Sequence, residues 1–278
     1  MKEHLLKLRS KTPRELKGEW ISEPNKPTSN LKIFDKLYID DKSTIKLTPF
    51  MDPLKVEKLN CEILLTDSDL EFIVKTYPNL TFLNLAHCKK LTNAGIFHLQ
   101  HLKKLQHLDM CFCFSAPYEK EQNITEESLI HLKDLPLKYL DLDRFYGLTD
   151  KGLEFFRNSK LEYLCINDSK ITNKGLEIIS TMPLKKLSMR SCKNITDNGL
   201  FYLTKLKQLN NLELHWCIGI TDFLAKYYRD SNAVQNFFYR LSYLQMHKAN
   251  FPQKVYTIIN DYHSNRWKCF FDGDFNTP

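Results

Sequence analysis

The sequence of 278 residues lacks long apolar segments and glycine-rich motifs. No segment approaches the roughly 18 apolar residues that a membrane-spanning helix requires. Residues 1–11 are charged throughout and have no apolar centre of the length found in a secretory signal. The eight glycines form neither a phosphate loop nor a dinucleotide-binding fingerprint. We therefore expect a soluble, cytoplasmic protein that does not enter a membrane and carries no cofactor.

Most of the chain consists of about seven copies of one pattern: Leu-x-x-Leu-x-Leu-x-x-Cys, a short gap, and Leu/Ile-Thr-Asp/Asn-x-Gly-Leu. The copy at residues 80–96 returns almost unchanged at residues 184–200. Successive copies lie 26, 33, 24, 23, 24 and 25 residues apart, counted between Thr66, Thr92, Thr125, Thr149, Thr172, Thr196 and Thr221. The long interval contains the polar stretch 115–122, which we interpret as an inserted loop.

Each copy has the spacing of one strand followed by one helix. Leu83-x-Leu85 has the two-residue period of a strand, and the apolar residues from Ile96 to Leu102 have the spacing of a helix. The threonine is expected to cap the helix, and the glycine three residues later to make room where the next coil presses close. A repeat of this length cannot bury its own apolar face, so the units must stack. The sequence therefore predicts an α/β solenoid.

We divide the chain into three parts. Residues 1–50 are predicted to form an N-terminal arm and cap with an irregular first repeat. Residues 51–250 hold about seven to eight repeats, and residues 251–278 form a C-terminal cap. We expect the chain to be a monomer on its own.

The positions of the cysteines and of the basic residues indicate structural roles rather than a catalytic, metal or nucleic-acid site. Four of the eight cysteines occupy the same repeat position: Cys88, Cys113, Cys192 and Cys217. A column of small buried thiols explains them without disulfides or a metal. The net charge is +7, and the first 32 residues contribute eight Lys/Arg against four Glu. We interpret this arm as a solvated flank rather than a nucleic-acid site.

The residues between the buried leucines are predicted to line one face of the sheet. The residue before the second leucine of each unit is, in turn, Val56, Phe82, His107, Tyr139, Tyr163, Lys186, Asn211 and Tyr243. Aromatic side chains beside arginines and acids are typical of protein interfaces, although such rings also pack across strands. Our candidate partner-binding residues are Phe82, His107, Asp109, Tyr139, Asp141, Asp143, Arg144, Tyr163, Asp168, Arg190, His215, Trp216 and Tyr243.

The acidic centre of this set repels phosphate, so we expect no nucleic acid to bind. It favours a protein partner that presents Lys or Arg to the acids and an apolar or aromatic group to the tyrosines. A cysteine hydrolase would combine Cys111 or Cys165 with a histidine base and Asp109 as its orienting acid. A shallow strip without oxyanion donors argues against it. We predict no catalytic residues and no metal site.

The stretches 91–99 and 105–113 resemble the cysteine-containing subfamily of leucine-rich repeats. This subfamily occurs in substrate receptors of cullin-type ubiquitin ligases and in GALA-type bacterial effectors. The resemblance implies a right-handed horseshoe with parallel strands on its concave face and helices on its convex face. The N-terminal arm is too short for the complete F-box of the ligase receptors.

What the resemblance implies about function is a non-enzymatic scaffold that binds a partner and occludes or regulates it. The GALA-type likeness implies a bacterial effector, delivered into a host cytosol, that acts on another effector or on a host enzyme. The alternative is the substrate-recognition subunit of a cullin-type ubiquitin ligase.

Overall fold

A computed structural model describes residues 53–61, 65–115, 123–221 and 232–246, together with the short strands β1 (Asp35–Lys36), β2 (Tyr38–Ile39) and β3 (Ile45–Lys46). The chain divides into the units Met1–Ile33 and Phe34–Pro278, and every described residue belongs to the second. The predicted C-terminal cap and the 116–122 part of the insertion lie outside the described residues. No helix in the described part of the chain is long and apolar enough to cross a membrane.

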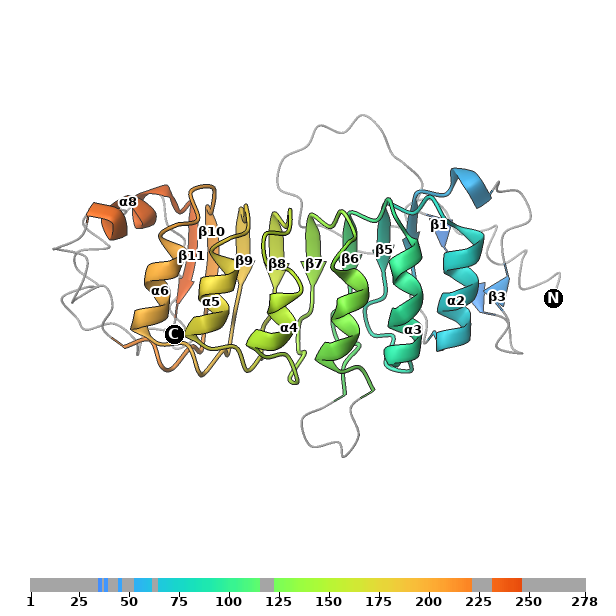
Figure 1. Ribbon diagram of the computed structural model, residues 1–278, viewed down its shortest axis with the longest axis horizontal. Coiled ribbons are helices and arrows are strands. Elements are labelled where there is room, and N and C mark those ends of the chain that lie inside the picture. Colours follow the sequence, from blue (N-terminus) through green and yellow to red (C-terminus); the bar gives the residue numbers. More distant parts are fainter. Residues whose placement is uncertain are drawn as a thin grey trace, which may run out of the picture. The chain divides into compact units, whose positions relative to one another are not determined.

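Nine strands of the described residues form one parallel sheet in the order of the sequence (Figure 1). Each strand pairs with the strand of the next unit, so that equivalent repeat positions lie side by side. β2 and β3 form a separate antiparallel pair. After β1 the sheet consists of β4 (Lys58–Asn60), β5 (Phe82–Asn84), β6 (His107–Asp109), β7 (Tyr139–Asp141), β8 (Tyr163–Cys165), β9 (Lys186–Ser188), β10 (Asn211–Leu214) and β11 (Tyr243–Met246).

Helices follow the strands and lie along one side of the sheet (Figure 1). Consecutive helices pack against each other from α2 through α6. In chain order they are η1 (Pro53–Lys55), α2 (Asp67–Thr76), α3 (Asn93–His98), η2 (Leu99–His101), η3 (Glu126–Leu132), α4 (Asp150–Glu154), α5 (Asn173–Ile179), α6 (Asp197–Leu203) and α8 (Asn232–Arg240). The predicted alternation of one strand and one helix per repeat is confirmed.

The repeated leucines fill the layer between the strands and the helices. Leu83 and Leu85 of one coil, and Leu108 and Met110 of the next, are completely buried. The same cluster contains the apolar residues of the helices, such as Ile96. Since each coil offers only one apolar side, its burial depends on both neighbours.

The predicted cysteine column is present, and each thiol has a hydrogen-bonding role. Cys113 Sγ donates to the carbonyl of Leu85 at 2.8 Å, and Cys217 Sγ donates to that of Met189 at 3.0 Å. Cysteine therefore combines small volume with a donor for a carbonyl of the preceding coil. No disulfide joins the cysteines of the described residues. Burial raises the pKa of Cys192 to about 11, so this thiol stays protonated near pH 7.

The first unit is shifted by two residues from the predicted alignment. We expected Val56 to begin the aromatic column, but the register pairs Lys58 with Phe82. Val56 is buried in the core because the preceding residues Pro53–Lys55 form the helix η1 instead of a strand.

The residue after each repeat threonine ties its coil to the following one. The Asp67 carboxylate accepts both the backbone N–H of Thr92, at 2.8 Å, and its hydroxyl, at 2.6 Å. Asp150 binds Thr172 in the same way. The further pairs are Asn93 with Thr125, Glu126 with Thr149, Asn173 with Thr196, and Asp197 with Thr221. The motif therefore encodes contacts between coils as well as helix starts.

This contact also explains the repeat glycine. A Cβ atom on Gly175 would lie 2.5 Å from the Asp150 carboxylate of the preceding coil. The expectation that the next coil presses on the glycine was therefore wrong, because the preceding coil does so. The Asp150 carboxylate lies over Gly175 when it accepts the hydrogen bonds from Thr172.

Replacing Gly175 by alanine is expected to lower the free energy of unfolding by about 2 kcal/mol, since overpacking outweighs the helix preference of alanine. The matched control is Gly147→Ala, where the nearest atom to the added Cβ would lie 3.4 Å away. Urea unfolding of both variants measures the difference. Equal stability of the two would contradict the crowding by Asp150.

Candidate functional site

Four rings stack in a row across the sheet, on the side opposite the core. Phe82, His107, Tyr139 and Tyr163 are register partners on β5 to β8. Their successive ring centroids are 4.1, 3.7 and 4.1 Å apart, and no pair of planes departs from parallel by more than 18°. All four are half-buried. The rings therefore form one ridge that packs across the strands, and each ring keeps part of its surface exposed.

The ring row carries no charge near neutral pH. Burial, together with the positive charge of Lys58, lowers the pKa of His107 to about 4. Burial raises the pKa of Tyr139 and Tyr163, which therefore keep their hydroxyl protons. Because the ring faces are stacked on one another, a binding partner meets ring edges and the tyrosine hydroxyls.

A row of acidic side chains runs beside the rings and is deeper than expected. We predicted Asp109 and Asp141 as outward residues, but they are only 5% and 9% exposed. Their Oδ1 atoms accept the backbone N–H groups of Cys111 and Asp143, both at 2.9 Å. These carboxylates thus stabilise the turn that follows each strand. The hydrogen bonds to the backbone hold them close to it.

Burial makes this acid pair costly to ionise. Asp109 and Asp141 are register partners on adjacent strands. Burial, and after it the negative charge of Asp109, raises the pKa of the Asp141 carboxyl to about 7. Burial also raises the pKa of Asp109. Near neutral pH the pair therefore holds part of a proton.

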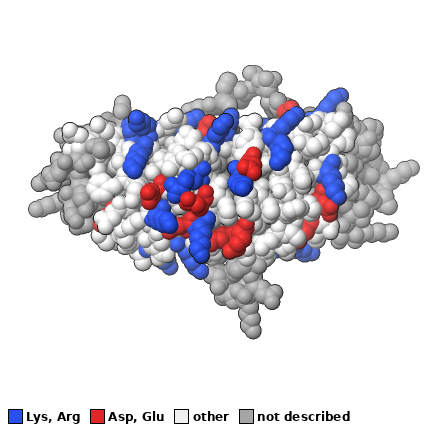
Figure 2. Space-filling view, in the orientation of Figure 1, with Lys and Arg blue, Asp and Glu red and all other residues white. Residues whose placement is uncertain are grey.

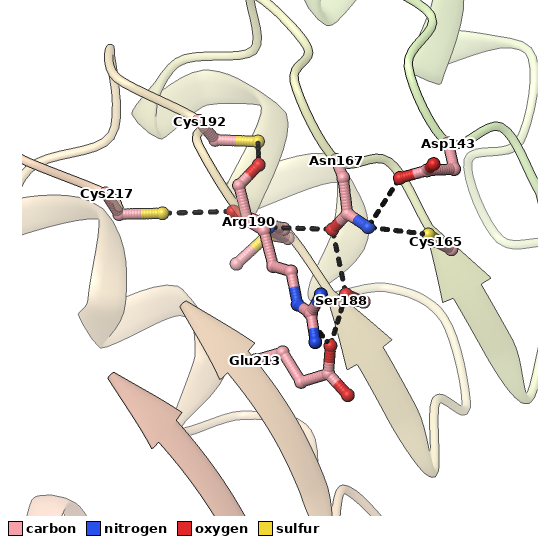
Figure 3. Close-up of polar contacts among 9 residues, drawn as sticks. Asp143, Cys165, Asn167, Ser188, Arg190, Cys192, Glu213 and Cys217 are labelled. Atoms are coloured by element: carbon pink, nitrogen blue, oxygen red, sulfur yellow. Dashed lines mark hydrogen bonds and ion pairs between the residues drawn. The ribbon is translucent and has the colours of Figure 1, made fainter. Parts of the chain in front are cut away.

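Asn167 connects the acid row to the next strands (Figure 3). Its Nδ2 donates to Asp143 Oδ1 at 2.7 Å, and its Oδ1 accepts the Ser188 hydroxyl at 2.8 Å. The same Oδ1 accepts the backbone N–H of Arg190, whose guanidinium contacts Glu213 at 3.0 Å. Asn167 and Glu213 were not among the candidate residues predicted from the sequence. Their repeat positions were visible, but the contacts across coils that give them a role were not.

A second row lies where the strands end, at positions with left-handed backbone. His87, Phe112 and Arg144 have φ of 66°, 59° and 63°. Their N–H groups donate to the carbonyls of Cys111, Asp143 and Asn167, in the turns after the next strands. The Phe112 ring stacks on His87 at 4.8 Å and meets the Arg144 guanidinium at 4.1 Å. The predicted residues Asp168 and Trp216 occupy the same position further along, with φ of 59° and 61°.

The structure brings together most of the predicted residues, but not all of them. The four rings lie with Asp109, Asp141, Asp143 and Arg144 on β5 to β8 and the turns that follow; Arg190, His215 and Trp216 lie on the turns after β9 and β10. His215 is 6% exposed, so its predicted open position was wrong, whereas Trp216 is 49% exposed. The backbone of Tyr243 pairs with Asn211, and its side chain is outside the described part. We call the side chains of β5 to β8 and the turns that follow them the strand face.

The thiols of the strand face are poor nucleophiles. Burial, followed by the charges of Asp141 and Asp143, raises the pKa of Cys111. Burial likewise raises the pKa of Cys165. A reactive cysteine requires the opposite shift. The donor atoms of Asp109, Cys111 and Asp141 lie within 4.8 Å of one another, but the thiol is protonated and we assign no metal to them.

The helix side differs from the strand face in its charge pattern. Figure 2 shows basic and acidic side chains interspersed on the face turned to the viewer, with uncharged surface between them. On this side Lys75 pairs with Glu71 on α2, and Arg157 pairs with Glu154 at the end of α4. Pairs of this kind contribute little to stability.

The repeated coils, the parallel sheet and the helical layer define an α/β solenoid. The family described as "Leucine Rich repeat" matches residues 78–99 and 182–203, which include the two most similar copies of the pattern, at 80–96 and 184–200. Together these observations support a leucine-rich-repeat protein.

Three solved structures show partial similarity to this chain. The yeast Rad7 and Elc1 complex has 15% identity and a TM-score of 0.42, and the match covers 72% of this chain and 65% of that one. Internalin C2 of Listeria monocytogenes has 22% identity and a TM-score of 0.38, with 62% and 66% covered. The Drosophila Toll–Spatzle complex has 11% identity and a TM-score of 0.40, with 72% and 25% covered. The match therefore spans less than two thirds of each of those chains.

Proposed function

We propose that this protein is a non-enzymatic scaffold whose strand face binds a partner protein and occludes or regulates it. The observation that carries the proposal is the ridge of four stacked, half-exposed rings beside a row of acids. Rigid aromatic side chains supply contact area at low entropic cost, and charged neighbours fix the orientation of the partner. The raised pKa values of Cys111 and Cys165 favour binding over cysteine catalysis.

The finer proposal is a bacterial effector that acts on another effector or on a host enzyme in the host cytosol. Its support is the GALA-type resemblance of the repeats. The second candidate is a substrate-recognition subunit of a cullin-type ubiquitin ligase. Purification of the tagged full chain from cell lysate separates the two, because only the second predicts co-purification of the ligase adaptor subunit.

Replacing both Tyr139 and Tyr163 by alanine is expected to weaken binding of the co-purified partner at least tenfold, since anchor rings at interfaces contribute strongly to affinity. Phe97→Ala is the control, because Phe97 is 44% exposed on the helix α3. Affinity is measured by titrating the purified partner, and thermal unfolding of each variant confirms that the fold is retained. Unchanged affinity in the tyrosine variant, or a loss confined to Phe97→Ala, would reject the strand face as the interface.

A further inference from the structure

Three neighbouring carboxylates on the strand face share one arrangement. Asp109, Asp141 and Asp143 each use Oδ1 to accept an N–H group, at 2.9, 2.9 and 2.7 Å. The other contacts of these carboxylates come from weaker donors. The Tyr139 hydroxyl reaches Asp141 Oδ2 at 3.5 Å, and the Cys111 thiol reaches Asp143 Oδ2 at 3.5 Å. The Cys165 thiol also hydrogen-bonds to the Asp141 carboxyl. In the described residues, no N–H group donates to any of these three Oδ2 atoms.

Within the described residues, Arg144 is the one cation that forms an ion pair with this group. Among the described residues, no ion pair involves Asp109 or Asp141, and the Arg144 Nε atom lies 3.9 Å from Asp143 Oδ2. That distance is too long for a hydrogen bond. Arg144 also lies on the face of Phe112 at 4.1 Å. A guanidinium stacked on a ring beside an acid is thus already present at the edge of the group.

The ring row of the proposed interface lies next to these acids. Tyr139 precedes Asp141 by two residues on β7, so both side chains stand on the same side of the sheet. Asp143 keeps 17% of its side chain exposed and Arg144 keeps 49%, which opens the acid row next to the ring ridge. A contact surface and a charged subsite therefore adjoin each other.

We infer that the partner's segment on the ring row carries an arginine, whose guanidinium binds Asp143 and Asp141 with Asp109 behind them. This inference rests on the proposed function and specifies the chemistry of the partner. Three Oδ2 acceptors call for a cation with several donors in a fixed plane. Guanidinium has five N–H donors, whereas the ammonium group of lysine has three at a single point.

Protonation of the acids competes with this binding. The titratable groups that interact with Asp141 are Asp109, Cys111, Cys113, Tyr139, Asp143, Tyr163 and Cys165. His87 acts on Asp109, and Arg144 forms an ion pair with Asp143. Since the pKa of Asp141 lies near 7, the subsite gains negative charge as the pH rises from 5 to 8. Binding of a cation should strengthen over that range.

The test uses acetyl-arginine amide as the probe, with acetyl-citrulline amide as the uncharged control of the same shape. The carboxyl carbons of ¹³C-labelled aspartate in the full chain are followed by NMR during titration. We expect saturable shifts of Asp141 and Asp143 with arginine and none with citrulline, and at least tenfold tighter binding at pH 8 than at pH 5. Asp143→Asn, which keeps Oδ1, should weaken it at least tenfold, and Asp134→Asn, at an exposed site, should not.

Other outcomes overturn the inference. Equal shifts with citrulline, or shifts confined to other acids, would exclude an arginine subsite. The same would follow if Asp143→Asn left both probe and partner binding unchanged while the Tyr139 and Tyr163 variant lost the partner, a result that would leave the proposed function standing. Retained partner binding in the tyrosine variant would reject the proposed function instead.

Discussion

Asp141→Asn is expected to stabilise the folded protein by about 3 kcal/mol at pH 8 and to have little effect at pH 4. Burial and the neighbouring charge of Asp109 raise the pKa of Asp141 to about 7 in the folded chain, against about 3.9 for an unfolded aspartate. The folded state therefore holds the proton more tightly, and ionising the carboxyl opposes folding. The penalty is absent below pH ~4 and approaches ~4 kcal/mol above pH ~7. Asparagine removes the charge and keeps the Oδ1 acceptor for the Asp143 N–H.

The measurement is urea unfolding of the wild type and the variant at intervals from pH 4 to pH 8, so that the difference between them isolates this one group. Asp134→Asn serves as the control at an exposed position and should give a flat difference. Asp141→Asn would then be a more stable protein with a weaker arginine subsite, so that lost binding cannot be attributed to unfolding. If the difference in the free energy of unfolding between variant and wild type does not grow with pH, the pKa of Asp141 is not raised in the folded protein.

The turn contact of Asp109 and Asp141 does not require their negative charge, although that charge lowers the stability of the fold. Asp109 and Asp141 each accept a backbone N–H in the turn after their strand. In the preceding unit the uncharged Asn84 makes the same contact, accepting the Ala86 N–H at 2.7 Å. An uncharged side chain is thus sufficient for the turn. That two adjacent coils nevertheless carry aspartate supports a role for the charge outside the fold.

The sequence predicts the solenoid well because its signals are local. The spacing of leucines within one coil determines which residues form the strand and which the helix, and the threonines mark where the helices begin. The prediction for the first unit was wrong because Pro53–Lys55 forms a helical turn, which places Val56 in the core. A single irregular turn shifts the register of the whole unit.

The candidate site was harder to predict because alternation gives the direction of a side chain but not its depth. The two-residue period placed Asp109 and Tyr139 on the correct side of the sheet. It could not show that Asp109 folds down onto the Cys111 N–H while the rings stack above the sheet. Asn167 was missed for a related reason, because its partners come from coils about 21 to 24 residues away.

Asn123→Ala is expected to lower the free energy of unfolding by about 3 kcal/mol, the largest loss for any single exposed or half-buried polar residue that we propose to change. Asn123 stands where the insertion 115–122 returns to the solenoid. Its Nδ2 donates to the carbonyls of Lys89, Leu91 and Cys113 at 3.3, 3.0 and 2.7 Å. Its Oδ1 accepts the N–H and the hydroxyl of Ser115, both at 2.8 Å. One side chain therefore joins two coils and closes the loop.

Alanine would leave several partly buried backbone groups without partners, and each such group costs about 1–3 kcal/mol before water compensates. The matched control is Asn194→Ala, since Asn194 precedes Ile195 and Thr196 as Asn123 precedes Ile124 and Thr125. The Asn194 side chain donates one hydrogen bond, to Lys170 at 3.4 Å, so its loss should cost under about 1 kcal/mol. Urea unfolding gives the two values, and hydrogen exchange of residues 85–95 should quicken only in Asn123→Ala. Equal losses in the two variants would mean that the insertion is closed by contacts other than the Asn123 amide.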